Sequence, residues 1–365
     1  MSTTTDTTTR TVRRDPDPDR LDELVGRFVG DFAVAMHATT VVIGDKLGLY
    51  RALALHGPVT AAQLASATQL DTRLVEEWLA AQFVSGYACH DPECGTFWLD
   101  AEQTALLADD ASPAFLVGAM TVATSTAKDE EQIRERFRTG GGLAWHEHHD
   151  DLFTGTERVF KPGYVANLVD AWIPALDGVD AKLRAGATVA DVGCGYGAST
   201  ILLAQRYPSS TVVGFDSHGT SVVEAGRRAA DAGLADRVRF EVASAQDFPG
   251  EAYDLVCVFD ALHDMGDPVG AGRHIRQALA ADGTLLVVEP MAGETLADNV
   301  NPIGRIFYSA STCICTPGAQ AQHGGLALGA QVPESRWAAL MAEAGYTRFR
   351  RATETPFNRV FEIRP

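Results

Sequence analysis

The sequence is poor in positive charge, and lysine is the scarcest of its charged residues. Its 365 residues include 26 Arg but only 4 Lys, and 48 acidic against 30 basic residues give a formal net charge of −18 at pH 7. A field of that sign repels phosphate backbones, so we expect no nucleic-acid partner.

Long apolar runs are also missing. Stretches such as Ala114–Ala123 fall short of the roughly 20 residues that a membrane-spanning helix needs, so we expect no membrane partner.

Cysteine is sparse and shows no pairing pattern. The six cysteines, at positions 89, 94, 194, 257, 313 and 315, form no CxxC motif and no disulfide framework spacing. The first residues lack the apolar core of a secretion signal, and we interpret residues 1–20 as a solvated, disordered tail. Scattered thiols without such a signal favour the reducing cytoplasm.

Apolar residues make up 46% of the chain, which excludes disorder for most of it, and the length suits two domains. Apolar periodicity begins at Leu21. Spacings of three and four between Leu24, Phe28 and Phe32 predict an amphipathic helix, and a second helical stretch covers Ala33–Ile43.

The segment from Leu49 to Asp100 has the order of a winged helix. Thr60 can cap a short helix over Ala61–Ala67, and Asp71 can cap a longer one with an apolar face. Apolar runs at residues 86–90 and 96–99, separated by a polar turn, then predict a hairpin. Such units often bind DNA, but the candidate recognition helix, DTRLVEEWLAAQF, carries one Arg against three acids. We therefore favour a structural or dimerising role.

Residues 101–180 look mainly helical, and from Thr188 short apolar runs alternate with helical segments. Runs buried on both faces, alternating with helices, indicate a parallel sheet with right-handed crossovers. The predicted strands are Thr188–Asp191, Thr211–Asp216, Val238–Ala243, Tyr253–Phe259 and Thr284–Glu289. The predicted helices lie near Ala198–Gln205, Ser221–Ala232, Pro268–Ala280 and Glu334–Ala344, and Tyr346–Ala352 with Phe357–Ile363 form a closing antiparallel pair.

The first predicted parallel strand ends in DVGCGYG, residues 191–197. Glycines at this place let a ligand approach the backbone at the start of a helix. Dinucleotide sites favour GxGxxG, whereas this loop is GxGxG and follows Asp191, an acid that suits a ligand with an ammonium or sulfonium group. Asp216 ends the second strand, 23 residues after Gly193, where a carboxylate can accept ribose hydroxyls. A nucleoside without phosphates, joined to a cationic amino acid, describes S-adenosylmethionine.

The segments DVGCGYGAST, FDALHDMGDP and VVEP resemble class I S-adenosylmethionine-dependent methyltransferases. The winged-helix start and the LHD motif resemble the small-molecule O-methyltransferases of plants and actinobacteria, and the likeness covers roughly residues 25–365. The resemblance implies an α/β fold: a Rossmann-like, seven-stranded, mostly parallel sheet with helices on both faces, preceded by a mainly helical winged-helix domain. It implies a dimerisation domain at 21–110, a helical connector at 111–180 and a catalytic domain at 181–365, with homodimers formed chiefly through 21–110.

The resemblance also assigns the cofactor residues. It makes Asp191, Gly193 and Gly195 the methionine-side loop, and it makes Asp216 the ribose acid. The position after the third strand, where relatives usually have an Asp against the adenine amine, is Ser244 here, and Gln246 and Asp247 are alternatives. The expected cofactor residues are Asp191, Gly193, Gly195, Asp216, Ser244, Ala245, Phe259 and Asp260.

Methyl transfer to a hydroxyl requires an aligned nucleophile and a base. His263 follows the fourth strand, its ordinary pKa near 6.5 suits a base at neutral pH, and the matching His is the base in the family that the chain resembles. The alternative is a His that only holds the loop. Glu289, Asp264 or Asp260 could orient the His263 ring, and Asp260 could instead contact the cofactor's amino group.

Further histidines leave a second interpretation open. His323 lies in QHGGLALG, where this fold inserts substrate-contacting structure, and WHEHHDD at 145–151 precedes the core. His263, Asp264 and His323 would make a two-His, one-carboxylate triad, which resembles the iron site of a bacterial 2-oxoacid C-methyltransferase. We favour a polar lining of a substrate pocket and assign no metal ligand. The expected catalytic residues are His263, Asp264, Glu289 and His323.

The leading hypothesis is methylation of a small organic molecule at oxygen. The alternatives are C- or N-methylation, with an iron site binding a 2-oxoacid, and a winged-helix transcription regulator. A further alternative is that the chain is a catalytically inactive member of the family that retains the cofactor site. Natural-product biosynthesis is the expected setting.

Overall fold

The computed structural model describes residues 15–365, so most of the predicted tail, residues 1–14, lies outside the described residues. The chain forms two compact units that divide between Asp100 and Ala101. We expected the winged-helix domain to end at residue 110. The difference arises because α5, Ala101–Leu107, belongs to the second unit: the backbone N–H of Leu116 donates to the carbonyl of Leu106.

The first unit begins with one long helix, α1, Pro18–Lys46. The prediction of two helical stretches starting at Leu21 was therefore wrong in its bounds. Asp17 caps the helix by accepting the N–H groups of Asp19 and Arg20, and proline is well suited to the first helical position. Residues 18–20 are thus helical, although we expected them to belong to the tail.

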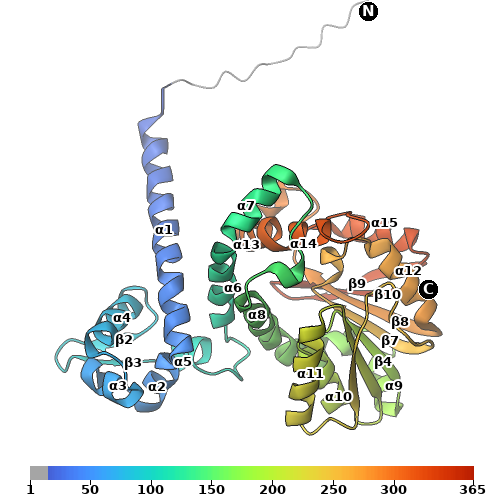
Figure 1. The fold of residues 1–365 in the computed structure, drawn as a ribbon, viewed down its shortest axis with the longest axis horizontal. Helices are drawn as coiled ribbons and strands as arrows, with labels where there is room; N and C mark the ends of the chain where they lie inside the picture. Colours follow the sequence, from blue (N-terminus) through green and yellow to red (C-terminus); the bar gives the residue numbers. More distant parts are fainter. Residues whose placement is uncertain (1–14) are drawn as a thin grey trace, which may run out of the picture. The chain divides into compact units, whose positions relative to one another are not determined.

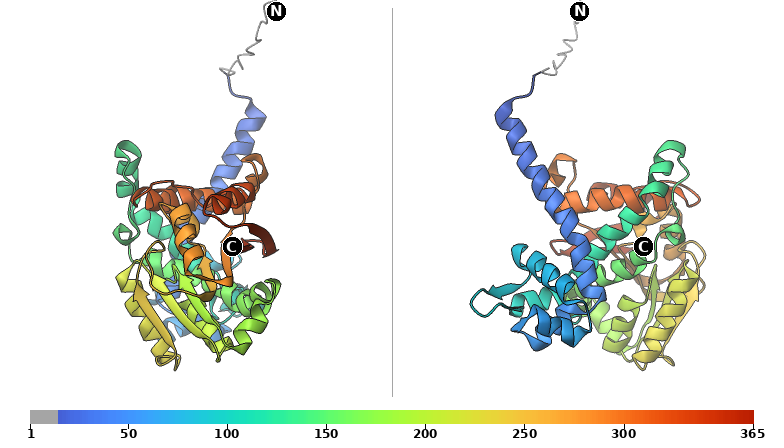
Figure 2. Two further views of the ribbon diagram at one scale, coloured as in Figure 1. Left: turned by 90° about the vertical axis from the view of Figure 1, so that its right-hand side faces the viewer. Right: turned by 60° about the vertical axis from the view of Figure 1, so that its left-hand side comes forward.

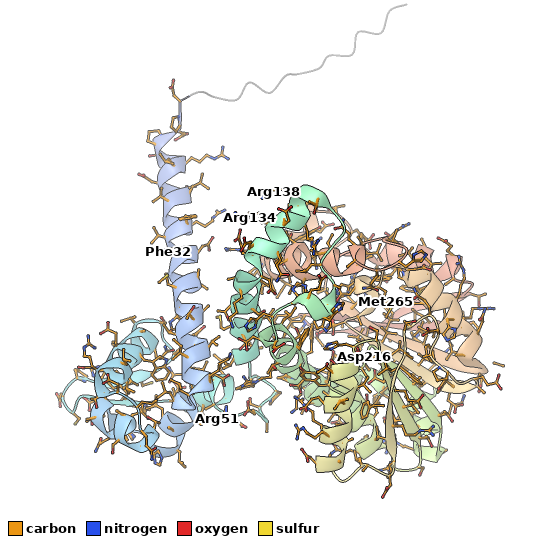
Figure 3. All side chains as sticks on the ribbon, in the orientation of Figure 1. Phe32, Arg51, Arg134, Arg138, Asp216 and Met265 are labelled. Carbon is orange, nitrogen blue, oxygen red and sulfur yellow. The ribbon has the colours of Figure 1, made fainter. Side chains whose placement is uncertain are left out.

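Among the described residues, α1 is long and apolar enough to cross a membrane, with a mean hydropathy of 1.2 over an 18-residue stretch that is 28% buried. Core helices and signal sequences share this length and composition, so these two properties alone do not place α1 in a membrane. Exposed apolar side chains stand out along α1, with Phe28 72% and Phe32 60% exposed (Figure 3).

The rest of the first unit confirms the predicted winged-helix order. Thr60 and Gln63 form a capping box at the start of α3, and Asp71 accepts the N–H of Leu74 at the start of α4. The predicted hairpin is β2 and β3, which lie with β1 in a sheet of order β1-β3-β2. The elements are α2 (Leu49–His56), β1 (Val59–Thr60), α3 (Ala61–Thr68), α4 (Thr72–Val84), β2 (Cys89–Asp91) and β3 (Thr96–Trp98).

The second unit contains the predicted seven-stranded sheet, with strand order β6-β5-β4-β7-β8-β10-β9. Five neighbouring strands, β6 to β8 in that order, are parallel, and β10 and β9 close the sheet as antiparallel strands (Figure 1). The strands are β4 (Thr188–Val192), β5 (Thr211–Asp216), β6 (Val238–Val242), β7 (Tyr253–Phe259), β8 (Leu279–Pro290), β9 (Arg348–Glu354) and β10 (Asn358–Arg364).

Helices pack on both faces of this sheet (Figure 2). Alternate side chains of β7 belong to two separate apolar clusters: Val256 packs with α12 and α15, and Leu255 packs with α9 and α10. This two-sided burial explains the continuous apolar runs of the sequence. These helices are α9 (Val179–Ala185), α10 (Ala198–Arg206), α11 (Gly219–Asp231), α12 (Pro268–Ala278) and α15 (Glu334–Glu343).

The remaining helices lie before the first parallel strand or between β8 and α15. They are α6 (Val117–Lys128), α7 (Glu130–Thr139), α8 (Asp151–Asn167), α13 (Pro302–Ala310) and α14 (Thr316–Gln320), with shorter turns at Trp145–Glu147, Leu168–Trp172, Ile173–Ala175, Ala297–Asn299 and Ser311–Cys315. A further short turn, Leu262–Asp264, lies between β7 and α12. Residues 140–144 join α7 to the turn at Trp145–Glu147.

Candidate functional site

A cavity of about 560 Å³ lies at the carboxyl ends of the parallel strands, the usual location of a site in such sheets. Residues from the ends of β4, β5, β6 and β7 line it, together with residues of α8 and of the segment from α13 to residue 330. Among the residues predicted from sequence, the lining includes Gly193, Gly195, Asp216, Ser244, Ala245, Phe259, Asp260, His263, Asp264 and His323. Asp191 and Glu289 are fully buried next to these residues and do not line the cavity.

The glycine loop between β4 and α10 requires glycine for its conformation. Gly193, Gly195 and Gly197 have φ values of +77°, +52° and +79°, a region that L side chains rarely adopt. At Gly197 an added Cβ would lie 2.7 Å from the Phe240 ring, whereas at Gly195 nothing lies within 4 Å. The open space at Gly195 is where a ligand could approach the backbone.

Asp216 ends β5 and joins the loop to the next helix (Figure 3). One carboxylate oxygen accepts the N–H of Gly195 at 2.9 Å, and the other accepts the N–H of His218 at 2.8 Å. Burial raises the pKa of Asp216, and the two backbone donors oppose that effect. Each carboxylate oxygen keeps a further lone pair, so the group can accept hydroxyl donors from the cavity.

Asp191 connects the end of β4 to the start of α10 through two hydrogen bonds. Its Oδ2 accepts the hydroxyls of Ser199 and Thr200, both at 2.6 Å. Burial raises its pKa to about 6, against the lowering effect of these two bonds. Asp191 thus fixes the start of α10 without lining the cavity, whereas Gly193 and Gly195 line it.

The segment after β6 contributes Ser244, Ala245 and Gln246 to the lining. Asp247 accepts both the backbone N–H and the hydroxyl of Ser244, at 2.8 and 2.7 Å. The Ser244 hydroxyl is therefore engaged in the turn. The side chain of Gln246 donates to the carbonyl of Asp267 at 3.3 Å, so the turn is tied to the segment before α12.

Asp260, directly after β7, has an unusual backbone conformation, with φ +49°. The side-chain amide of Asn358 donates to its Oδ1 at 2.7 Å, and the Tyr164 hydroxyl lies 3.4 Å from its Oδ2. Burial raises the pKa of Asp260 well above its ordinary value, and Glu289 adds to that effect. Asn358 was not assigned to the site from sequence, because it comes from a distant segment that only the fold brings next to Asp260.

His263 lies in a short turn after β7 and is 3% exposed. Its Nδ1 is 2.7 Å from Glu289 Oε2, and Glu289 Oε1 accepts the backbone N–H groups of Leu262 and His263. With Oε2 as the acceptor of this contact, Nδ1 carries the hydrogen, and Nε2 is the ring nitrogen that faces away from Glu289. Of the candidate partners predicted from sequence, Glu289 contacts Nδ1 and Asp264 lies near Nε2, whereas Asp260 bonds to neither nitrogen.

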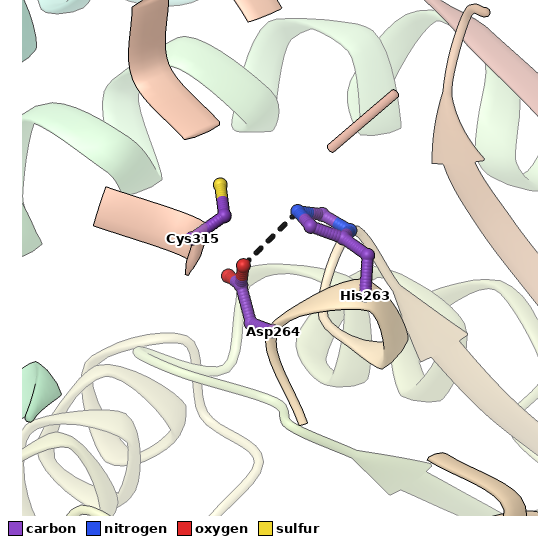
Figure 4. Close-up of side chains that lie close together, drawn as sticks. All are labelled: His263, Asp264 and Cys315. Atoms are coloured by element: carbon purple, nitrogen blue, oxygen red, sulfur yellow. Dashed lines mark ion pairs between the residues drawn. The ribbon is translucent and has the colours of Figure 1, made fainter. Parts of the chain in front are cut away.

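Asp264 and Cys315 surround the other nitrogen of His263 (Figure 4). Asp264 Oδ1 is 3.2 Å from His263 Nε2, and the Cys315 thiol bonds with the side chains of both residues. Burial lowers the pKa of His263, but Asp264 and Glu289 outweigh it and hold that pKa well above its ordinary value. Cys315 was not assigned to the site from sequence, although a thiol shortly before His323 in the same inserted segment could have drawn attention to it.

The alternative triad of His263, Asp264 and His323 differs from what the structure assembles. Among residues 15–365, the group that could hold a metal ion is His263, Asp264 and Cys315, and His323 lines the cavity from an exposed position. In the WHEHHDD segment, His148 is buried against Asp129 with Nδ1 and Oδ2 3.0 Å apart, and this segment forms no metal group within the described residues. It connects helices instead.

The cavity is lined by an excess of acidic side chains. Glu157, Asp216, Asp260 and Asp264 line it, and over residues 15–365 the lining includes neither Lys nor Arg. One of these carboxylates, that of Asp260, is buried and the other three are partly buried, and carboxylates of this density favour a ligand with a positive group. The residues present thus fit a cofactor that combines a sulfonium or ammonium group with a ribose and a base.

Comparisons with known proteins agree with this geometry. Residues 183–325 match the model of a methyltransferase domain, and residues 35–109 match that of an Rv2258c-like winged HTH domain. A curated relative, the 27-O-demethylrifamycin SV methyltransferase of Amycolatopsis mediterranei, is 33% identical over 131 residues. The match covers 34% of this chain, and the chain spans about half the length of that relative, 48%.

Two solved structures share the fold along almost the whole chain. The mitomycin 7-O-methyltransferase MmcR has a TM-score of 0.67 and 23% identity, with 95% of this chain and 100% of that chain covered. Human N-acetylserotonin methyltransferase, in complex with SAM, has a TM-score of 0.71 and 17% identity, with 97% and 99% covered. The chain contains a methyltransferase domain of the class I S-adenosylmethionine-dependent fold, preceded by a winged helix-turn-helix domain.

Proposed function

We propose that this protein transfers a methyl group from S-adenosylmethionine to a hydroxyl oxygen of a small organic molecule. The observation that supports the proposal most directly is the position of His263. It lines the same cavity as the glycine loop and Asp216, and Glu289 fixes its ring from behind. A base and a nucleoside site in one cavity are what hydroxyl methylation requires.

In this proposal the loop at Gly193 and Gly195 holds the amino-acid part of the cofactor, and Asp216 accepts the ribose hydroxyls. Ser244, Ala245 and Gln246 lie where they can contact the base, and Phe259 and Asp260 complete that side of the cavity. When bound, the cofactor supplies an activated methyl group for in-line displacement. The carboxylates of the cavity favour its positive charge.

His263 acts as the general base. Its Nε2 accepts the proton of the acceptor hydroxyl, and Nδ1–H remains on Glu289, which orients the ring and stabilises the imidazolium formed. Asp264 lies next to the same nitrogen and helps to position the hydroxyl. His323 and the apolar cluster with Trp145, Phe307 and Ile314 form the acceptor side, which suits an apolar acceptor.

Two of the alternatives receive less support. Over the described residues, nothing in the cavity presents the cationic side chains that usually hold a 2-oxoacid carboxylate. A DNA-binding role would use α4, but its Arg73 is paired with Glu77 on an otherwise acidic surface. A role in natural-product biosynthesis fits relatives named for rifamycin and mitomycin.

We further propose a cytoplasmic homodimer that pairs through residues 21–110. Among the described residues, which include all six cysteines, no disulfide is formed, and this suits a reducing compartment. The apolar side chains of α1 provide a surface for a second copy.

The test is direct analysis of the purified protein. Native mass spectrometry should detect S-adenosylmethionine or its demethylated product, and calorimetry should give micromolar or tighter affinity for both. Methyl-labelled S-adenosylmethionine, offered with a panel of phenols, should yield labelled ethers whose formation depends on His263. Absence of cofactor binding at millimolar concentration would refute the proposal.

A further inference from the structure

We propose that His263, Asp264 and Cys315 also form a binding site for a divalent cation of borderline softness, with Zn²⁺ as the reference ion. This site goes beyond the proposed methyl transfer, because it needs neither the cofactor nor the acceptor. It combines an imidazole nitrogen, a carboxylate oxygen and a thiol sulfur, which are the three ligand types of protein zinc sites.

The first support is the spacing of the ligand atoms. One ligand atom from each residue lies within 4.8 Å of the other two, and His263 Nε2 is 3.2 Å from Asp264 Oδ1. Bonds of about 2.0–2.3 Å in a tetrahedral site place neighbouring ligand atoms roughly 3.3–3.8 Å apart. Side-chain shifts of a few tenths of an ångström to about one ångström therefore suffice to enclose an ion.

The second support is that the nitrogen and the oxygen are prepared for a ligand. Glu289 binds His263 Nδ1 at 2.7 Å, which leaves the Nε2 lone pair directed away from it. A carboxylate behind the histidine is the common arrangement in metal sites, where it fixes the tautomer and raises the basicity of the ligand. Asp264 Oδ1 is buried and makes no hydrogen bond to any described residue, although Nε2 is close. Such an atom is a ready ligand.

The third support is charge. Asp264 and Glu289 lie 3.2 and 2.7 Å from the two nitrogens of His263, Asp260 lines the same cavity, and over residues 15–365 no Lys or Arg lines it, so the like charges of these carboxylates repel one another. A divalent cation would offset this repulsion, because buried charges are generally paired or bound to metal. On binding, the Cys315 thiol and the Nε2–H of a protonated His263 lose their protons to solvent, and the sulfur and the nitrogen form the bonds to zinc, so zinc binding releases protons and strengthens as pH rises. The cavity leaves a fourth position open to water or to an acceptor hydroxyl.

Zinc at this site takes the Nε2 lone pair that the proposed base needs. The zinc-bound protein and the base-competent protein are therefore alternative states, and zinc should inhibit methyl transfer. Because zinc binding is measured without cofactor or acceptor, its failure is distinguishable from failure of the proposed methyl transfer.

The experiment uses the full-length protein after treatment with a chelator. Calorimetry with ZnCl₂ should show about one ion bound per chain, and CoCl₂ should give a near-ultraviolet absorption band from thiolate to cobalt. Cys315→Ser should abolish that band, and Asp264→Asn and Glu289→Gln should each weaken zinc binding by about 10- to 100-fold. Cys313→Ser is the matched control: it removes a thiol from the same segment but outside the cluster, and should change neither result.

Two outcomes would overturn the site. One is a wild-type protein that binds no zinc at 100-fold molar excess over chain, on the order of millimolar, while its circular dichroism spectrum is that of a folded protein. The other is zinc binding of unchanged affinity in both Cys315→Ser and Asp264→Asn. The cobalt band is measured on the wild-type protein, so the proposal can be refuted even if a variant fails to fold.

Discussion

The protonation state of His263 determines the pH range in which the proposed reaction can run. Burial lowers the pKa of this histidine, yet the carboxylates of Asp264 and Glu289 hold it well above its ordinary value. The base must be neutral, so turnover should rise as pH increases through that raised pKa, with the rising limb above neutral pH. A pH profile of kcat with labelled cofactor checks this. A limb at or below pH 6 would contradict it.

Replacement of His263 separates a base from a structural residue. His263→Ala should lower turnover by about 10²–10⁴-fold, the usual effect of losing a positioned base, with cofactor affinity little changed. His146→Ala, an exposed histidine outside the cavity, is the control and should retain full turnover. If His263→Ala lost thermal stability together with activity, the residue would be structural. A stable and fully active variant would refute the mechanism.

The proposed role of Asp216 can be tested by cofactor binding alone, without a methyl acceptor. Asp216→Ala should weaken S-adenosylmethionine binding by about 1.5–3 kcal/mol, the scale for hydrogen bonds to a charged group. The loss includes bonds to cofactor hydroxyls and the support that this carboxylate gives to Gly195 N–H. Calorimetry measures it, and Asp236→Ala, an exposed acid on the turn after α11, serves as control. Equal affinities in the wild type and Asp216→Ala would remove Asp216 from the ribose site.

At the scale of single residues, sequence reasoning reached those whose place follows from the end of a strand. Gly193, Asp216, Asp260 and His263 were all predicted this way, because the carboxyl ends of parallel strands meet at one edge of a sheet. Cys315 was missed, since it belongs to an inserted segment whose path across the cavity depends on tertiary packing.

At the scale of elements, the start of α10 depends on one glycine. Gly197 has φ +79°, and a Cβ there would lie 2.7 Å from the Phe240 ring and 3.1 Å from the Ala225 side chain. Gly197→Ala should therefore destabilise the protein by about 1–3 kcal/mol and weaken cofactor binding, because the strain falls on the glycine loop. Thermal unfolding and calorimetry measure the two effects.

The control for that substitution is Gly226→Ala in the neighbouring helix α11. Nothing lies within 4 Å of an added Cβ there, and its φ is ordinary for a helix. This variant should be neutral or slightly stabilising, because alanine favours the helix relative to glycine. Equal unfolding temperatures for the two variants would contradict the special role of Gly197.

The bounds of helices and strands were predicted best where the sequence shows a capping residue or the apolar run of a strand buried on both faces. Thr60 and Asp71 placed α3 and α4 correctly, and β5 and β7 have the predicted bounds. The prediction failed at α1, which continues from Phe32 into Ala33 without the expected break and also includes glycines at positions 26 and 30. Each of these glycines has open space around it and costs about 1 kcal/mol relative to alanine, which a long helix tolerates.

At the scale of the whole molecule, the exposed apolar face of α1 requires an explanation. Monomers rarely expose a contiguous apolar surface of this kind. We predict that it is covered by a second copy of the chain, so that light scattering at micromolar concentration should give about twice the chain mass of 39.0 kDa. Phe28→Asp combined with Phe32→Asp, two side chains 72% and 60% exposed, should shift the mass to that of a monomer.

Val223→Asp on α11 is the matched control, since Val223 is 75% exposed but lies in the second unit. This variant should remain a dimer, because a charge on an unpaired surface costs little.

The competing explanation for α1 is insertion into a lipid surface, which its length and hydropathy would permit. A monomer mass for the wild type, together with sedimentation on lipid vesicles that Phe28→Asp and Phe32→Asp abolish, would replace the dimer with a membrane contact. Five ionisable residues lie in its first ten, at positions 19, 20, 22, 23 and 27, and burying these in hydrocarbon would be costly. That cost is the physical reason to expect the second copy.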